Sequence, residues 1–251
     1  MPPAPLLPPA PVVPPHREPA PWTLSGCDAV ATAVNTRIDL AEAPLGLAVA
    51  DGLQVLGLLL PEGCRPVEAW QRGTDLTAVY EPQDDRQLRI TAMWRLGAAA
   101  SGSATRSWQM VLSSQTSLLT STAELTVLST INGVQSNEHG RWAGDSVAWE
   151  IEHELPATCL RVRQATPDGV GRCVLIAIHP DDPGAITTER RDNGSEQVAC
   201  RLFPSDVEKG VLLRSRVLVA VGTDEATLEA SDGWSADLLR QFAGSPPVLT
   251  A

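Results

Sequence analysis

Apolar and charged positions alternate most regularly between residues 147 and 182, and this stretch predicts three consecutive β-strands. One face of the first strand carries apolar residues and one histidine, namely Val147, Trp149, Ile151, His153 and Leu155. The other face carries Glu150, Glu152 and Glu154. Because successive side chains of a strand point to opposite faces, the pattern indicates an antiparallel sheet with one apolar and one solvated side.

The turn near Pro156 sets the register that we expect between the first two of these strands. With two loop residues after Pro156, Glu154 lies opposite Arg161. By the same register, Glu152 lies opposite Arg163. We interpret the glutamate row as a solvated ladder of salt bridges. The alternative is that two of these carboxylates serve glycoside chemistry.

Most of the remaining chain is also strand-like. Strands are expected over Ala29–Ala41, Leu53–Leu60, Pro66–Glu81, Gln87–Leu96, Trp108–Thr120, Ala123–Ile131, Cys173–His179, Ile186–Arg191, Gln197–Phe203 and Gly210–Gly222. Turns at 82–86, at 120–122 and at Asn193-Gly194 predict three hairpins. The Gly- and Asn-rich stretch Asn132–Asp145 is expected to be a loop, where a functional site would first be sought.

Hairpin-linked strands of this number predict an all-β fold, a large two-layer antiparallel β-sandwich, with a barrel as the alternative. The period changes to helical within Asp224–Phe242, which predicts a short C-terminal helical segment. We expect one domain over 22–251. Residues 1–21 are rich in proline and predict a disordered arm, which would act as a linker or bind a proline-reading partner.

Charge and cysteine content narrow the class of protein. The net charge is −11 and the pI is near 4.8, so a nucleic-acid partner is not expected. No uninterrupted apolar run is long enough to span a membrane, and the arm lacks the pattern of a secretory signal, so we expect a soluble protein. Five cysteines with no Cys-x-x-Cys pair indicate buried free thiols and favour a reducing, cytoplasmic compartment.

Aromatic and charged residues of the 66–96 region form the first candidate site. We predict a ligand-binding surface made of Trp70, Arg72, Asp75, Trp94 and Arg95, joined by Trp142 from the glycine-rich stretch. Indole rings can stack on a sugar ring while Arg and Asp hydrogen-bond its hydroxyl groups. The alternative is a tryptophan core with Arg–Asp pairs on the outer face.

Histidines supply the candidates for catalysis. His179 precedes Asp181 at the end of a strand, and a histidine beside a carboxylate could act as an acid–base pair. His153 could serve as a general base if it faces an open sheet, and Glu138 with His139 offers a similar pair. In each case the alternative is a structural role. No phosphate-binding, zinc-protease or serine-hydrolase motif occurs, and we expect neither a metal nor a cofactor.

Three functions follow as hypotheses. The first is a non-catalytic module that binds a carbohydrate or another ligand through the tryptophan surface. The second is a sugar-active enzyme, an epimerase, lyase or hydrolase, that uses a histidine and a carboxylate. The third is a structural or protein-interaction domain tethered to a protein partner by its proline-rich arm.

Overall fold

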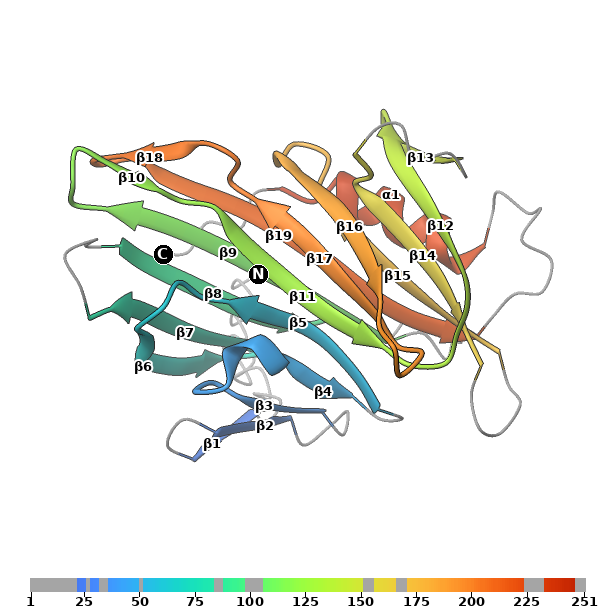
Figure 1. Ribbon diagram of the computed structural model, residues 1–251, viewed down its shortest axis with the longest axis horizontal. Helices are drawn as coiled ribbons and strands as arrows, with labels where there is room; N and C mark the ends of the chain where they lie inside the picture. Colours follow the sequence, from blue (N-terminus) through green and yellow to red (C-terminus); the bar gives the residue numbers. More distant parts are fainter. Residues whose placement is uncertain are drawn as a thin grey trace, which may run out of the picture.

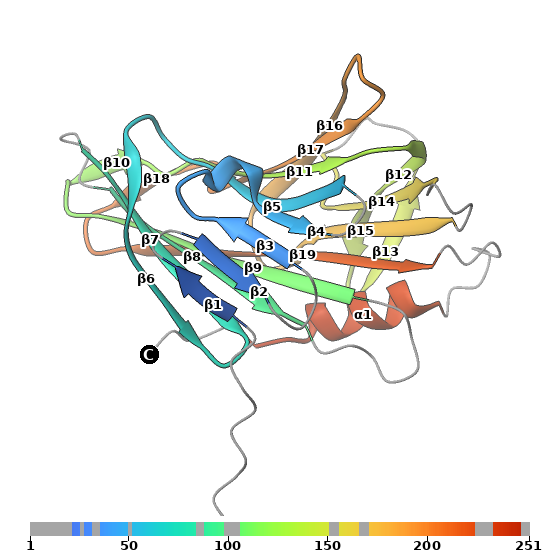
Figure 2. The same ribbon diagram turned by 90° about the horizontal axis from the view of Figure 1, so that it is seen from below.

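In the part of the chain that the structure describes, two large antiparallel β-sheets pack face to face, and one short helix lies on the outside of one sheet (Figures 1 and 2). The computed structural model describes residues 22–25, 28–31, 36–49, 52–83, 88–97, 106–150, 156–165, 171–223 and 233–246. The predicted fold class, a large all-β sandwich with a short C-terminal helix, is confirmed. The proline-rich arm and His153 lie outside the described residues.

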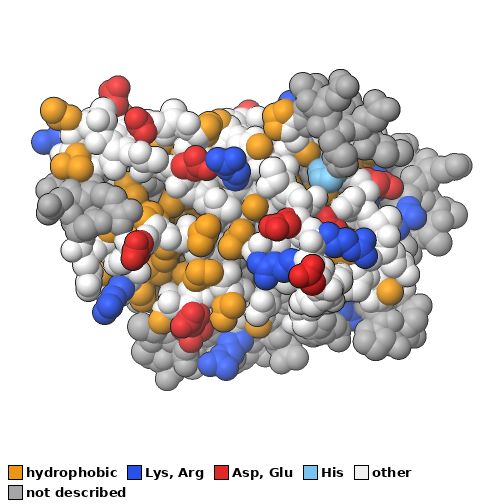
Figure 3. All heavy atoms as spheres, in the orientation of Figure 1, with side chains coloured by type: hydrophobic (Ala, Val, Ile, Leu, Met, Phe, Trp, Pro, Cys, Tyr) orange, Lys and Arg blue, Asp and Glu red, His pale blue; other side chains and the backbone are white. Residues whose placement is uncertain are grey.

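The first sheet has eight strands. In spatial order they are β1 (Trp22–Ser25), β2 (Asp28–Ala31), β3 (Thr36–Asp39), β4 (Leu47–Val49), β5 (Leu53–Leu59), β11 (Leu125–Ile131), β17 (Glu196–Leu202) and β16 (Gly184–Arg190). A single 3₁₀ turn, η1 (Ala43–Leu45), joins β3 to β4. Figure 3 looks onto this sheet, and acidic and basic side chains are interspersed over the visible face.

The second sheet has nine strands. In spatial order they are β13 (Ser146–Glu150), β12 (Val134–Ala143), β14 (Cys159–Gln164), β15 (Arg172–Ile178), β19 (Leu212–Thr223), β9 (Arg106–Thr116), β8 (Leu88–Leu96), β7 (Asp75–Pro82) and β6 (Cys64–Arg72). Strands β10 (Thr120–Thr122) and β18 (Asp206–Glu208) form a separate two-stranded ribbon. Strand β19 therefore joins the β6–β9 meander to the β12–β15 group.

The main core lies between the two sheets. Alternate residues of each strand face it, as in β8, where Leu88, Ile90, Ala92, Trp94 and Leu96 are buried there. The other face of β8 carries Arg89 and Arg95, so its period-two pattern separates core from surface. Removal of this apolar area from water is the main force that holds the two sheets together.

Helix α1 (Trp234–Ala243) covers part of the outer face of the nine-stranded sheet. Its Leu239 and Phe242 pack with outward side chains of the central strands, namely Cys159, Leu175, Ala177, Leu218 and Ala220. This second cluster explains why strands β15 and β19 are apolar on both faces. Gly222 lets the helix approach closely, because a Cβ atom there would lie 2.6 Å from Cε2 of Trp234.

The register predicted between β13 and β14 is wrong. Arg161 lies opposite Glu138 of β12 rather than Glu154, and its Nη2 is 2.8 Å from Oε2 of Glu138. The physical reason is that β14 pairs with one edge of β12 while β13 pairs with the other edge. The intervening residues 151–155, which include most of the glutamate row, are outside the described residues.

The expected loop at 132–145 is also wrong, because most of it forms strand β12. The loop was predicted because glycine is common in loops, but here the glycines have other roles. Gly140 lies inside the strand and makes room for its neighbours, since a Cβ atom there would be 2.6 Å from Val147 and 2.8 Å from the Trp149 ring. Gly133 and Gly144, at the two ends of the strand, have the positive φ angles that turns need.

Two predicted hairpins differ from the observed pairing. The segment 66–81 contains two strands, β6 and β7, because Gly73 adopts a positive φ angle and reverses the chain. Strands β9 and β11 do not pair with each other. The chain passes from β9 into β10 and then crosses to the eight-stranded sheet, where β11 lies between β5 and β17.

Other predictions are confirmed. Strands β16 and β17 form a hairpin around Asn193-Gly194, where Gly194 has a φ angle of 77°. Cys159 lies opposite Ala177 and Cys173 lies opposite Arg163, so these two thiols do not face each other. The four described cysteines are free thiols.

Candidate functional site

Four of the predicted binding residues share the outer face of the nine-stranded sheet at its β6 edge. Arg72 lies opposite Asp75, which in turn lies opposite Arg95, so these three residues form a row across β6, β7 and β8. Trp70 is two residues before Arg72 on β6 and therefore projects from the same face. The structure thus brings together an indole ring, two guanidinium groups and one carboxylate.

Asp75 and Arg95 hold each other in a fixed orientation. Arg95 Nε donates to Oδ1 of Asp75 and Nη2 donates to Oδ2, each at 2.7 Å. This bidentate geometry is the strongest form of the Arg–carboxylate pair. The hydrogen bond to Asp75 raises the pKa of Arg95, so the guanidinium keeps its charge. Side-chain orientation in the middle of the row is therefore set in advance.

Trp70 is the most exposed tryptophan, with 44% of its surface accessible. Thr77, directly opposite it on β7, and Met93, opposite Thr77 on β8, are both buried. The indole therefore stands at the open edge of the sheet, beside side chains that are already covered. Ring surface at this place is available to a ligand.

The other two predicted binding residues lie elsewhere. Trp94 is completely buried between the sheets, and its Nε1 donates to the carbonyl of Leu56 at 3.0 Å. Trp142 is half-buried in the helix-covered cluster, and its Nε1 donates to the carbonyl of Ile178 at 2.7 Å. Both indole N–H groups are used to hold the fold, so neither tryptophan belongs to the surface around Trp70.

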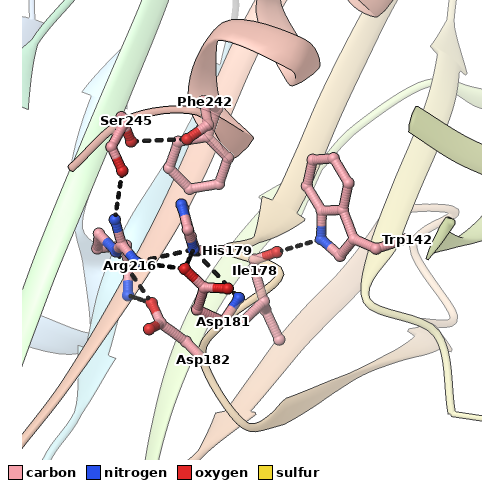
Figure 4. A network of polar contacts seen from close by, with 8 residues as sticks. All are labelled: Trp142, Ile178, His179, Asp181, Asp182, Arg216, Phe242 and Ser245. Carbon is pink, nitrogen blue, oxygen red and sulfur yellow. Dashed lines mark hydrogen bonds and ion pairs between the residues drawn. The ribbon is translucent and has the colours of Figure 1, made fainter. Parts of the chain in front are cut away.

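His179 lies in a buried polar network at the end of β15, shown in Figure 4. Its Nδ1 faces two donors, Nη2 of Arg216 at 2.8 Å and the backbone N–H of Asp181 at 3.2 Å. Since both groups can only donate, Nδ1 must accept, and the imidazole is neutral. Burial lowers the pKa of His179 and the charge of Arg216 lowers it further, while Asp182 and Asp181 act in the opposite direction.

Arg216 connects three parts of the chain in this network. Its Nε and its backbone N–H both donate to Oδ2 of Asp182, at 3.2 and 2.7 Å, and its Nη1 donates to the carbonyl of Ser245 at 3.0 Å. The guanidinium thereby ties β19 to the turn after β15 and to the end of helix α1. Arg216 is only 3% exposed, so this is a structural anchor inside the protein.

The predicted pair of His179 and Asp181 is therefore brought close without forming an accessible acid–base site. The carboxylate Oδ2 is 3.7 Å from Nδ1, and the Asp181 side chain is 80% exposed, whereas the imidazole has no exposed surface. A substrate could not contact the ring unless the turn moved. The arrangement fits the structural alternative stated for this turn.

Residues of β12 also have structural partners. Arg161, held by Glu138, stacks on the Trp149 ring with its guanidinium carbon 4.1 Å from the ring centre. The amide of Asn137 donates to the carboxylate of Glu196 on the other sheet. His139 lies opposite Leu160, on the face of β12 away from Glu138, so these two residues do not form a pair.

One open pocket was not foreseen from the sequence. It has a volume of about 370 Å³ and is lined by Glu124, Gly184, Ala185, Arg201, Leu202 and Pro204. Arg201 and Glu124 form an ion pair at 2.6 Å on its wall. The sequence pattern does not bring Glu124 to this place, because Glu124 reaches Arg201 only through the pairing of β11 with β17.

The comparisons with protein-family models and with curated proteins find no match to this chain. Within the described residues, no group of three or more His, Cys, Asp or Glu side chains is placed to hold a metal ion. No helix in the same part of the chain has the length and apolar character needed to cross a membrane.

Proposed function

We propose that the protein is a non-catalytic carbohydrate-binding module whose ligand lies on the outer face of β6, β7 and β8. The observation that carries the proposal is the placement of Trp70. Its exposed indole shares one face with the Arg72–Asp75–Arg95 row. A flat apolar ring next to fixed hydrogen-bonding groups is the combination that a sugar ring requires.

The Asp75–Arg95 pair supports the proposal because it is rigid. Each partner already fixes the other through two hydrogen bonds, so little side-chain entropy is lost when a hydroxyl group binds to either of them. The guanidinium retains Nη1 as a donor, and each carboxylate oxygen retains a lone pair as an acceptor. A vicinal pair of sugar hydroxyls could use both.

The enzyme hypothesis has less support. His179 is neutral, has no exposed surface and is held by Arg216, so it offers no accessible base. On the proposed binding surface, the described residues of β6–β8 include no histidine. We therefore place the ligand there without assigning a reaction.

Tryptophan fluorescence tests the proposal. We expect acrylamide to quench one accessible class of tryptophan in the native protein, and we expect that class to be missing from Trp70→Ala. A bound oligosaccharide should protect the same class from quenching. Val67→Ala is the matched control, because Val67 is an exposed apolar residue on the same strand, and its removal should leave sugar binding unchanged.

The panel should contain neutral and acidic oligosaccharides, and circular dichroism should verify that each variant is folded. The proposal fails if no sugar protects Trp70, or if Trp70→Ala binds a sugar as tightly as the unaltered protein.

A further inference from the structure

Arg72 is a cation of the binding surface that has no ionic partner among the described residues. It lies directly opposite Asp75, but both carboxylate oxygens of Asp75 are bonded to Arg95. Among the described residues none forms an ion pair with Arg72, and its side chain is exposed. A positive charge is therefore available two residues from Trp70 on the same face.

The charges around it leave this surface slightly cationic. The charged side chains on the outer face of β6–β8 are Arg65, Glu68, Arg72, Asp75, Glu81, Arg89 and Arg95. Four are arginines and three are carboxylates, which gives a net charge of +1 in a chain whose overall charge is −11. An anion is thus favoured here more than on an average part of the surface.

All three carboxylates of this surface are engaged by arginines of β8. Arg95 holds Asp75, while Arg89 contacts Glu81 at 2.6 Å and Glu68 at 3.4 Å. Among the described residues, the arginines of β6 have no such partners. Arg72 is the one next to Trp70, whereas Arg65 lies at the opposite end of the strand, beyond the irregularity between Pro66 and Glu68.

We propose that the ligand is an acidic sugar, a uronate, with its carboxylate on Arg72 and its ring on Trp70. This inference rests on the proposed function. The two residues are separated by about 7 Å along the strand, from a rise of about 3.4 Å per residue. That spacing suits a pyranose ring whose carboxylate, attached at its edge, reaches the neighbouring side chain. A guanidinium binds a carboxylate through two parallel hydrogen bonds, which a neutral hydroxymethyl group cannot make.

The test compares each acidic oligosaccharide with its own methyl ester, which keeps the sugar and removes the charge. Oligomers of galacturonate, glucuronate and mannuronate serve as probes, with binding measured by protection of tryptophan fluorescence and by titration calorimetry. We expect at least one acid to bind about tenfold more tightly than its ester, since a hydrogen bond between two charged groups is stronger than one to a neutral group. Added salt should reduce that preference.

Two arginine variants test whether Arg72 is responsible for the preference for the acid over its ester. Arg72→Gln should lose the preference for the acid while it still binds the ester, and the matched control Arg65→Gln should keep the preference. Equal binding of acid and ester in all three pairs would overturn the inference and leave carbohydrate binding intact. The inference is also overturned if Arg72→Gln retains the preference. If neither acids, esters nor neutral sugars bind, the proposed function fails together with the inference.

Discussion

Nη2 of Arg216 lies 2.8 Å from Nδ1 of His179, so a buried cation donates a hydrogen bond to a neutral imidazole. The same guanidinium binds a carboxylate of the turn after β15 and a carbonyl at the end of α1. The Arg216 side chain thus links helix α1, the turn after β15 and strand β19.

Replacement of Arg216 by Met should lower the free energy of unfolding by about 3–5 kcal/mol, because the partly buried Asp182 carboxylate loses the guanidinium and keeps only the backbone N–H of residue 216. The carbonyl of Ser245 loses its guanidinium donor, and Nδ1 of His179 loses one of its two donors. Urea denaturation measures the loss. Arg89→Met is the control, since Arg89 forms ion pairs at an exposed site and should contribute less than about 1 kcal/mol. Similar losses in the two variants would show that the network does not anchor the fold.

Stability should fall as the pH is lowered through the range in which His179 gains a proton. The pKa of His179 in the folded protein lies below its ordinary value of 6.5. The unfolded chain therefore binds more protons between these two values, and the stabilisation is complete above pH 6.5 and is lost below it. The slope contributed by one such group is at most about 1.4 kcal/mol per pH unit. His179→Gln should lack this part of the slope, and an identical pH profile for both proteins would contradict the assignment.

Gly222→Ala should weaken the attachment of α1. The added methyl group would meet the Trp234 ring at 2.6 Å, and such overpacking costs about 1–3 kcal/mol. A double-mutant cycle with Trp234→Ala provides the control, because removal of the indole leaves room for the methyl group. The alanine at 222 should cost much less in the Trp234→Ala background. An equal cost in both backgrounds would mean that the strain arises elsewhere.

Cys159 and Cys200 should resist alkylation in the native protein. Burial raises the pKa of both thiols to about 12, so almost no reactive thiolate exists at pH 8. Cys64 is only half-buried and should react earlier. Iodoacetamide labelling with peptide mass spectrometry, carried out with and without urea, measures the order. Labelling of Cys159 as fast as that of Cys64 in the native state would contradict the structure.

The sequence predicted correctly those strands, turns and helices that are determined by their own residues. The Asn193-Gly194 turn identified the β16–β17 hairpin, because glycine readily adopts the positive φ angle that Gly194 has in this turn. Strand β5 and the C-terminal helix were also predicted from local patterns, an apolar run and a helical period respectively. The partner of Arg161 was missed, since Glu138 comes opposite it only after β12 inserts between β13 and β14. Pairing between strands that are far apart in the sequence does not change the local alternation of apolar and polar residues, so the pattern could not reveal it.

Some residues with similar sequence surroundings differ in their burial. Trp70 and Trp94 both lie in strands with an arginine within two residues, yet Trp70 faces solvent and Trp94 faces the core. The choice depends on which face the second sheet covers. His179 and Asp181 were correctly expected to be neighbours, but Arg216, which determines the state of the imidazole, is 37 residues from His179 along the chain. The partner could not be inferred from spacing.

The central place of β19 has a consequence for synthesis. The nine-stranded sheet forms from two groups, β6–β9 and β12–β15, and these share no hydrogen-bonded edge until β19 lies between β9 and β15. A nascent chain that has not yet extended past residue 212 therefore presents two unpaired strand edges to the surrounding solution. Such edges recruit strands from other chains. On the ribosome, closure of this sheet must wait for its last strand.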